Sequence, residues 1–149
     1  MKTIVALVDF SDVASKVLEQ AGAQAKAFGA RVVLMHVVPK EAVVLDLGLV
    51  SPVVMKSATA EGIKGDYEKL EVLRESLIQR GVDVLMEPLA EGTVEKVLAE
   101  CRMWQADLIV IGSHHHSTVY NWFMGSFTVD VVKSAECPVL VVPAKSETA

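Results

Sequence analysis

The chain has 149 residues, of which 52% are hydrophobic, and it carries a formal net charge of -5 at pH 7. That length fits one domain with a sizeable core, and we expect a single domain over residues 1–149. The acidic balance and the absence of any Lys/Arg run argue against nucleic acid or an anionic membrane as a partner, because both select clustered positive charge.

Cysteine usage and the N-terminal run bear on the compartment. Cys101 and Cys137 show neither metal-ligand nor disulfide-framework spacing, so we interpret them as buried free thiols. The first apolar run is interrupted by Asp9 before it reaches signal-peptide length, and no segment approaches the ~20 apolar residues of a membrane span. These features predict a cytoplasmic protein.

The first apolar run, Thr3 to Val8, is short, continuous and rich in branched residues. This pattern is typical of a strand that is covered on both faces. Apolar residues then recur at helical spacing from Val13 to Phe28, with Ser11 or Asp12 expected as the N-cap and Gly29 as the stop. A buried strand followed by an amphipathic helix is predicted.

The middle of the chain repeats this alternation. A second strand is predicted over 31–38 and a long helix over 60–77, with a third strand over 82–87 that ends at Pro88. Between the second strand and the helix, residues 40–55 carry glycine and proline without a clean period, which indicates an irregular loop or lid.

The last third contains two more helix and strand pairs. Thr93 precedes a helical stripe from Val94 to Cys101, and a fourth strand follows over 107–111. A short helix over 128–135 and a strand over 138–142 complete the pattern. Strands alternating with helices predict a parallel sheet with helices on both faces, an α/β fold.

In such open sheets the ligand crevice lies at the carboxyl ends of the strands, where the winding reverses. Asp9 and Gly112 each follow or close a buried strand. Gly125 and Ser126 are expected directly before a helix, where the amides of Ser126, Phe127 and Thr128 would form an anion site. A plain Gly-Ser helix cap is the alternative.

The glycine segment resembles a known family. Gly112, Gly125 and Ser126, followed by Glu136-Cys137-Pro138-Val139-Leu140-Val141-Val142, look like the carboxyl-terminal signature of the universal stress proteins. The resemblance extends over nearly the whole chain, through Val8-Asp9-Phe10-Ser11, His36-Val37-Val38 and Glu91-Gly92. It implies a Rossmann-like fold with strand order 3-2-1-4-5 and a stress-response binding or signalling role. It also implies a homodimer paired through the C-terminal strand, which would cover that edge of the sheet.

The resemblance also implies a site for ATP or AMP. By position, Gly112, Gly125 and Ser126 would meet the phosphates, and Asp9 would lie near the ribose or bind Mg²⁺ together with the nucleotide. Val37 would lie at the adenine, and Val139 would line the same site. In the family motif, Gly-x2-Gly-x9-Gly-Ser/Thr, the second glycine falls at His115 of this chain.

His115 leaves several alternatives open. Its imidazole could block the pocket, or His115 or His116 could donate a proton to the phosphates. Blockage would favour a second hypothesis, a nucleotide-independent dimeric interaction protein of the same family. The three consecutive histidines favour no protein-only metal site, because no His or Cys partner lies at ligand spacing.

A third hypothesis is a slow adenine-nucleotide hydrolase, which only the analogy of fold favours. The chain has no Gly-x-Ser-x-Gly elbow, no Walker-type Gly-Lys-Ser/Thr and no carboxylate pair beside the glycine segment. No catalytic residue is therefore predicted, and any turnover is expected to be weak and incidental to binding.

Overall fold

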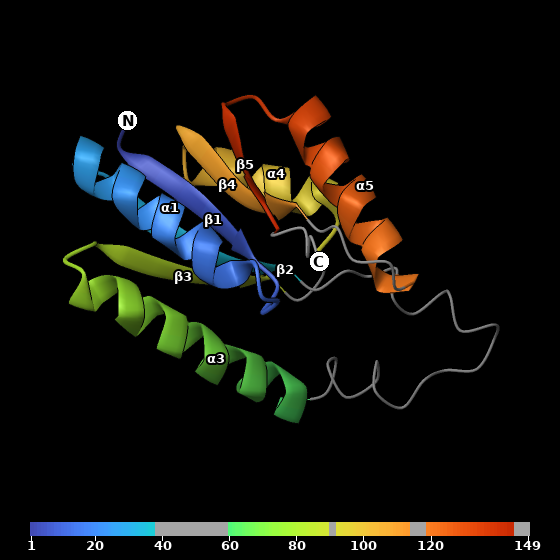
Figure 1. The fold of residues 1–149 in the computed structure, drawn as a ribbon, viewed down its shortest axis with the longest axis horizontal. Coiled ribbons are helices and arrows are strands. Elements are labelled where there is room, and N and C mark those ends of the chain that lie inside the picture. The colour runs from blue at the N-terminus through green and yellow to red at the C-terminus, as the bar shows by residue number, and fades with distance from the viewer. Residues whose placement is uncertain (38–59, 90–91, 114–118, 145–149) are drawn as a thin grey trace, which may run out of the picture.

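The computed structural model describes residues 1–37, 60–89, 92–113 and 119–144, which form an open five-stranded sheet with helices on both faces (Figure 1). The elements in chain order are β1 (Thr3–Val8), α1 (Ala14–Phe28), β2 (Arg31–Val37), α3 (Ala60–Gln79), β3 (Val84–Leu89), α4 (Val94–Met103), β4 (Leu108–Ser113), α5 (Val119–Ser134) and β5 (Val139–Pro143). All strand pairs are parallel, and their order is β3-β2-β1-β4-β5. The predicted fold is confirmed.

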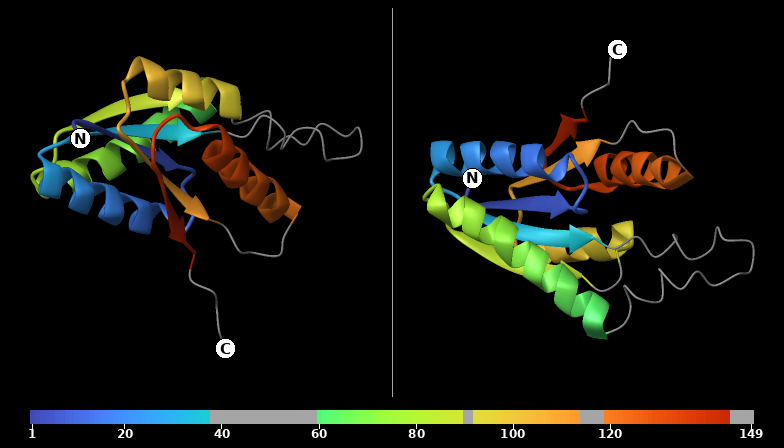
Figure 2. Two further views of the ribbon diagram at one scale, coloured as in Figure 1. Left: turned by 90° about the horizontal axis from the view of Figure 1, so that it is seen from above. Right: turned by 60° about the horizontal axis from the view of Figure 1, so that its bottom comes forward.

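The core divides into two layers because alternate strand residues point to opposite faces of the sheet. One layer packs Ile4 and Ala6 of β1 against α1 and α3, and the other packs Val5 and Leu7 against α4 and α5. Every residue of β1 is buried, as its continuous apolar run predicted. The views in Figure 2 show helices on both sides of this central sheet.

The beginning of α1 differs from the prediction. The N-cap position is Val13, which makes no side-chain cap, whereas Ser11 and Asp12 lie in the preceding turn. The amide of Ala14 instead donates to the Ser11 carbonyl at 2.9 Å, so a backbone oxygen meets one of the helix's open amides. The predicted stop is confirmed, since Gly29 adopts a left-handed φ of 63° at the C-cap.

The third strand continues through the proline that was expected to end it. β3 spans Val84–Leu89 and therefore includes Pro88, which pairs in register with His36. β3 is an edge strand of the sheet. Proline has no amide hydrogen, and at an edge it loses no ladder hydrogen bond where the amide would face away from the neighbouring strand. Position at the edge explains why Pro88 is tolerated.

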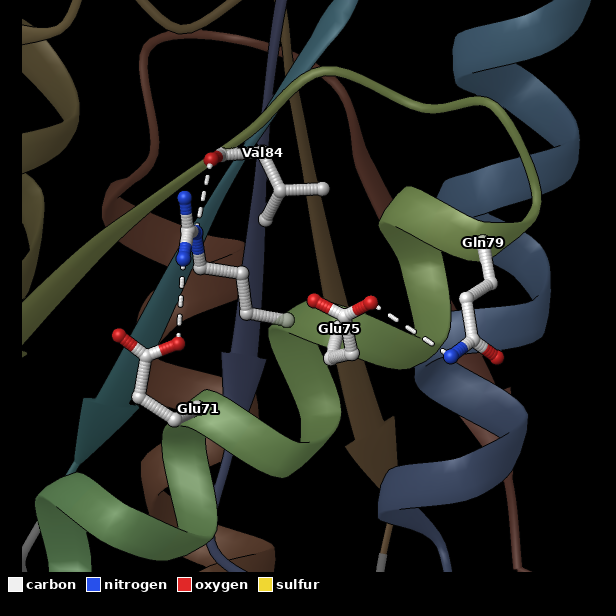
Figure 3. A network of polar contacts seen from close by, with 5 residues as sticks. Glu71, Glu75, Gln79 and Val84 are labelled. Carbon is white, nitrogen blue, oxygen red and sulfur yellow. Dashed lines mark hydrogen bonds and ion pairs between the residues drawn. The ribbon is translucent and has the colours of Figure 1, made fainter.

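A polar contact ties α3 to this edge strand. Arg74 donates through Nε to the Val84 carbonyl at 3.4 Å and through Nη1 to Glu71 at 3.1 Å, and one turn later Gln79 donates to Glu75 at 3.5 Å (Figure 3). The bond to Val84 fixes the helix beside the first residue of β3. The lid predicted over 40–55 lies outside the described residues, and no described helix is long and apolar enough to span a membrane.

Candidate functional site

The carboxyl ends of β1, β2 and β4 meet where the strand order reverses. Leu7 of β1 pairs with Ile111 of β4, so Asp9 and Gly112 follow within two positions at the same end of the sheet. Val37 is the last residue of β2 at that end. From β1 the chain winds toward β2 on one side, while β4 lies on the other, which is the arrangement that opens a ligand crevice.

A tight turn carries the chain from β1 into α1. The Oδ1 atom of Asp9 accepts a hydrogen bond from the Ser11 amide at 3.0 Å, a local pattern that Asp favours in turns. Phe10, between them, has a φ of 61°, which is a strained conformation for an aromatic residue. Its neighbours must therefore hold it in place.

His36 is the residue that holds Phe10. The two rings lie 4.1 Å apart between centroids at an interplanar angle of 31°, and the Lys69 Nζ atom lies 5.4 Å from the Phe10 centroid on the α3 side. His36 is buried on β2, where its Nδ1 lies 3.0 Å from the Val8 carbonyl and its Nε2 lies 3.6 Å from Asp66 Oδ2. These contacts join β1, β2 and α3 beside the crevice.

The protonation state of His36 follows from this environment. Burial lowers its pKa below 6.5, and the Val8 carbonyl, Asp66 and Asp9 oppose that shift only in part. The ring is therefore neutral at pH 7. Since a carbonyl oxygen can only accept, the proton lies on Nδ1 and the Nε2 atom facing Asp66 carries none. Protonation of Nε2 would convert that approach into an ion pair.

Gly112 has a packing reason to be glycine. A Cβ atom at this position would lie 1.9 Å from Cγ1 of Val13, so only glycine lets the start of α1 approach β4 this closely. The Gly112 carbonyl accepts a hydrogen bond from the buried Thr128 hydroxyl at 3.1 Å. Gly112 thus joins α1 on one face of the sheet to α5 on the other.

Gly125, the last glycine of the motif, lies within a helix and not directly before one. A helix was expected to begin directly after Gly125 and Ser126, but α5 begins at Val119 and contains both of them, with Phe127, in its interior. Interior amides bond to carbonyls four residues earlier. The predicted anion site on free amides is therefore wrong. Residues 119–124 contain no glycine or proline to stop a helix, and one glycine costs it only about 1 kcal/mol.

Val139 lies away from the end of the sheet that Asp9 and Gly112 share. Val139 begins β5 and pairs with Ile109, whereas Gly112 at the crevice pairs with Val142. At about 3.3 Å per residue, Val139 lies roughly 10 Å along β5 from Val142, the partner of Gly112. It packs instead in the layer beneath α4 and α5. His115 and His116 lie outside the described residues.

Sequence reasoning missed the contacts of Phe10, His36 and Asp66 because His36 and Asp66 lie 30 positions apart in the numbering. A histidine within an otherwise apolar strand was the available signal. Among the described residues, no three His, Cys, Asp or Glu side chains converge on a metal position. A divalent cation would therefore need ligands beyond the Asp9 carboxylate.

The strand order defines an open, doubly wound α/β fold, whose topological switch point lies between the carboxyl ends of β1 and β4. The universal stress protein family model matches residues 1–143. A universal stress protein of Thermus aquaticus is 33% identical over 143 residues, which cover 95% of this chain and 98% of that one. The chain belongs to the universal stress protein family.

Solved structures agree at the level of the fold. The hypothetical protein MJ0577 superposes with a TM-score of 0.75 at 24% identity, covering 98% of each chain. A universal stress protein in complex with cAMP gives 0.69 at 22% identity, over 95% of this chain and 96% of that one. The Archaeoglobus fulgidus protein in complex with dAMP gives 0.66 at 23% identity, over 95% and 96%.

Proposed function

We propose that this protein is a stress-response binding and signalling module that holds an adenine nucleotide, ATP or AMP, at the carboxyl ends of β1, β2 and β4. The observation that carries the proposal is that Asp9 and Gly112 come together where the winding of the sheet reverses. The two related folds solved with cAMP and dAMP support an adenine nucleotide as the ligand class.

Each residue has a role that its chemistry suits. The Asp9 carboxylate accepts hydrogen bonds from ribose hydroxyls. Val37 is proposed at the adenine and Gly112 at the phosphates by family position. Ser126 and His115 are proposed at the phosphates by family position alone. Mg²⁺ fits only together with the nucleotide, since that ion takes one or two carboxylates and completes its shell with phosphate oxygens and water.

The test begins with the purified full chain. Denaturing it and separating the released small molecules should yield an adenine nucleotide, and calorimetric titration of nucleotide-free protein with ATP and AMP, with and without Mg²⁺, should give saturable heat. An empty extract together with no heat at millimolar nucleotide would reject the proposal.

A matched pair of variants assigns the binding to the crevice. Asp9→Asn removes the charge but keeps an oxygen that can accept from the Ser11 amide, so the turn should persist. We expect it to weaken nucleotide binding roughly tenfold, as the loss of a charged hydrogen bond does. Asp12→Asn makes the same charge change at an exposed position three residues away and should leave the affinity unchanged.

One observation favours the second candidate, a nucleotide-independent interaction protein. Gly125 and Ser126 lie inside α5, so their amides are not offered to phosphates. His115→Gly separates the candidates, because it restores the family motif. If the parent binds no nucleotide and the variant does, His115 is the limiting feature and the interaction role is favoured for the natural chain.

We also propose a homodimer through β5, in keeping with the family resemblance. β5 is a sheet edge, and its Val141 is 38% exposed. An exposed apolar edge invites pairing with another strand. Sedimentation should show a dimer at micromolar concentration, and Val141→Glu should shift it to monomer. A stable monomer for the parent would contradict this assembly.

A further inference from the structure

A cavity lies away from the crevice, on the face of the sheet covered by α4. It has a volume of about 250 Å³ and is lined by both cysteines, Cys101 and Cys137, and by apolar side chains that include Leu98, Ala106 and Ile109. Ile109 pairs with Val139, the first residue of β5, whereas the crevice begins at Gly112. The cavity therefore lies toward the amino ends of the strands.

Backbone hydrogen bonds hold both cysteine-bearing segments beside this cavity. The Cys101 carbonyl accepts from the Ala106 amide at 2.9 Å, and the carbonyl of Pro138, directly after Cys137, accepts from the Ile109 amide at 3.0 Å. One short segment, 106–109, thus anchors both the end of α4 and the start of β5. Two residues so anchored keep a fixed relation in the folded protein.

The neighbouring side chains show that the two segments face each other. Arg102, next to Cys101, approaches Glu136, next to Cys137, with 3.4 Å between Nη1 and Oε1. This pair is exposed and adds little stability. Its value is geometric, since residues adjacent to the two cysteines reach each other across the cavity rim.

Both thiols are free, and they differ in accessibility. Cys101 is buried, whereas Cys137 is half-buried. Burial chiefly raises the pKa of Cys101 to about 12, with the nearby Cys137 as the next cause, and burial also raises the pKa of Cys137. A small oxidant reaches the more exposed Cys137 first, and the raised pKa of that thiol makes the oxidation slow at neutral pH, because only the thiolate reacts.

We propose that Cys101 and Cys137 form a reversible disulfide across this cavity when the protein meets a hydroperoxide. The sulfur of Cys137, as its thiolate, attacks the peroxide, the O–O bond breaks, and an alcohol or water leaves, which makes a sulfenic acid. Cys101 then attacks that sulfur, the S–O bond breaks, and water leaves with the remaining proton. Two thiols are oxidised and one hydroperoxide is reduced.

The bond would close a loop that contains β4 and α5, the elements on one side of the crevice. Closing a loop of that length restricts the unfolded chain, so oxidation should raise the midpoint of thermal unfolding by several degrees.

The experiment treats the reduced full chain with hydrogen peroxide, blocks remaining thiols with iodoacetamide and measures the intact mass. We expect the mass of the monomer to fall by two hydrogen atoms, with no label taken up. Digestion under non-reducing conditions should yield a disulfide-linked peptide that joins Cys101 to Cys137. Dithiothreitol should restore both free thiols. Separate labelling of both cysteines after oxidation, or a linkage only between chains, would overturn the proposal.

Two variants test the order of attack. In Cys101→Ala, the sulfenic acid of Cys137 should persist and be trapped by dimedone. In Cys137→Ala, a change at the less buried position, Cys101 should stay reduced over the time in which the parent is fully oxidised. Oxidation of Cys101 at the parent's rate in Cys137→Ala would overturn the assignment, even if Cys101→Ala fails to fold.

Discussion

The two halves of the crevice are built in different ways. At the ends of β1 and β2, side chains make the structure, because Phe10 stacks on His36, and His36 contacts Val8 and Asp66. At the end of β4, the absence of a side chain makes it, because Gly112 leaves the space that Val13 fills. The first half therefore depends on polar and aromatic contacts between distant residues, and the second depends on close backbone packing.

Gly112→Ala should break the β4 half and have the largest effect. Its methyl group would meet Cγ1 of Val13 at 1.9 Å, so α1 or β4 must shift. Because both sides of this contact are buried, we expect the free energy of unfolding to fall by about 2–3 kcal/mol in a urea titration.

The controls for Gly112→Ala use the same chemistry elsewhere. Gly65→Ala adds a methyl group that meets no described atom within 4 Å apart from its chain neighbours and the backbone of its own helix, and in α3 it should be neutral or stabilising. Val13→Ala combined with Gly112→Ala should destabilise less than the sum of the single changes. Strict additivity of the two would mean that Gly112 does not owe its role to Val13.

His36→Asn tests the β1–β2 half. Asn keeps a donor for the Val8 carbonyl but loses the stacked ring and leaves a small cavity, so we expect a loss of about 1–3 kcal/mol at pH 7. Burial lowers the pKa of His36 in the folded chain. As the pH falls below about 6.5, His36 therefore takes up a proton in the unfolded chain before it does so in the folded chain.

The contribution of His36 to stability is complete above pH 6.5 and declines as the pH falls toward its pKa in the folded protein. The midpoint temperature of thermal unfolding should therefore fall more steeply between pH 7.5 and pH 5 for the parent than for His36→Asn. Asp66→Asn removes a group that raises this pKa, and it should extend the decline to lower pH. Equal slopes for the parent and His36→Asn would contradict the neutral, buried ring.

The same comparison shows what a sequence can predict. The strand Thr3–Val8 and the apolar part of β4, predicted over 107–111, were predictable because continuous apolar runs mark central strands. The end of α1 was predictable from Gly29. Pro88 misled because its effect depends on lying in an edge strand, which is a property of the whole sheet. Local signals predicted elements well and their surroundings poorly.

In the candidate site too, local signals predicted where elements end but not which distant residues contact each other. Asp9 and Gly112 were predictable because parallel strands share a carboxyl end, whereas the contact between His36 and Asp66 depends on where α3 docks. The start of α5 was missed because Gly125 and Ser126 resemble a helix start, and tertiary context decides whether such residues cap a helix or continue one.

Thr128→Val tests the link between α5 and β4 with a smaller effect. The hydroxyl of Thr128 donates to the Gly112 carbonyl at 3.1 Å in a buried position. Removing it should lower the free energy of unfolding by about 1–2 kcal/mol, because a buried carbonyl loses a donor. Thr128→Ser keeps the hydroxyl and should retain that bond, losing only the contribution of one methyl group. Equal losses for both variants would mean that the hydrogen bond adds nothing.

Gly125→Ala should have the smallest effect. The sign of that effect shows whether Gly125 lies within a continuous α5 or directly before a helix. In the interior of α5, alanine is favoured over glycine, so the free energy of unfolding should rise by about 0.5–1 kcal/mol in a urea titration. If Gly125 instead served a close approach to phosphate before a helix, the same change would weaken nucleotide binding without stabilising the chain. Stability is measured by urea unfolding and nucleotide affinity by calorimetry, on one preparation. A gain in stability with unchanged affinity supports the continuous helix. A loss of affinity without that gain contradicts it.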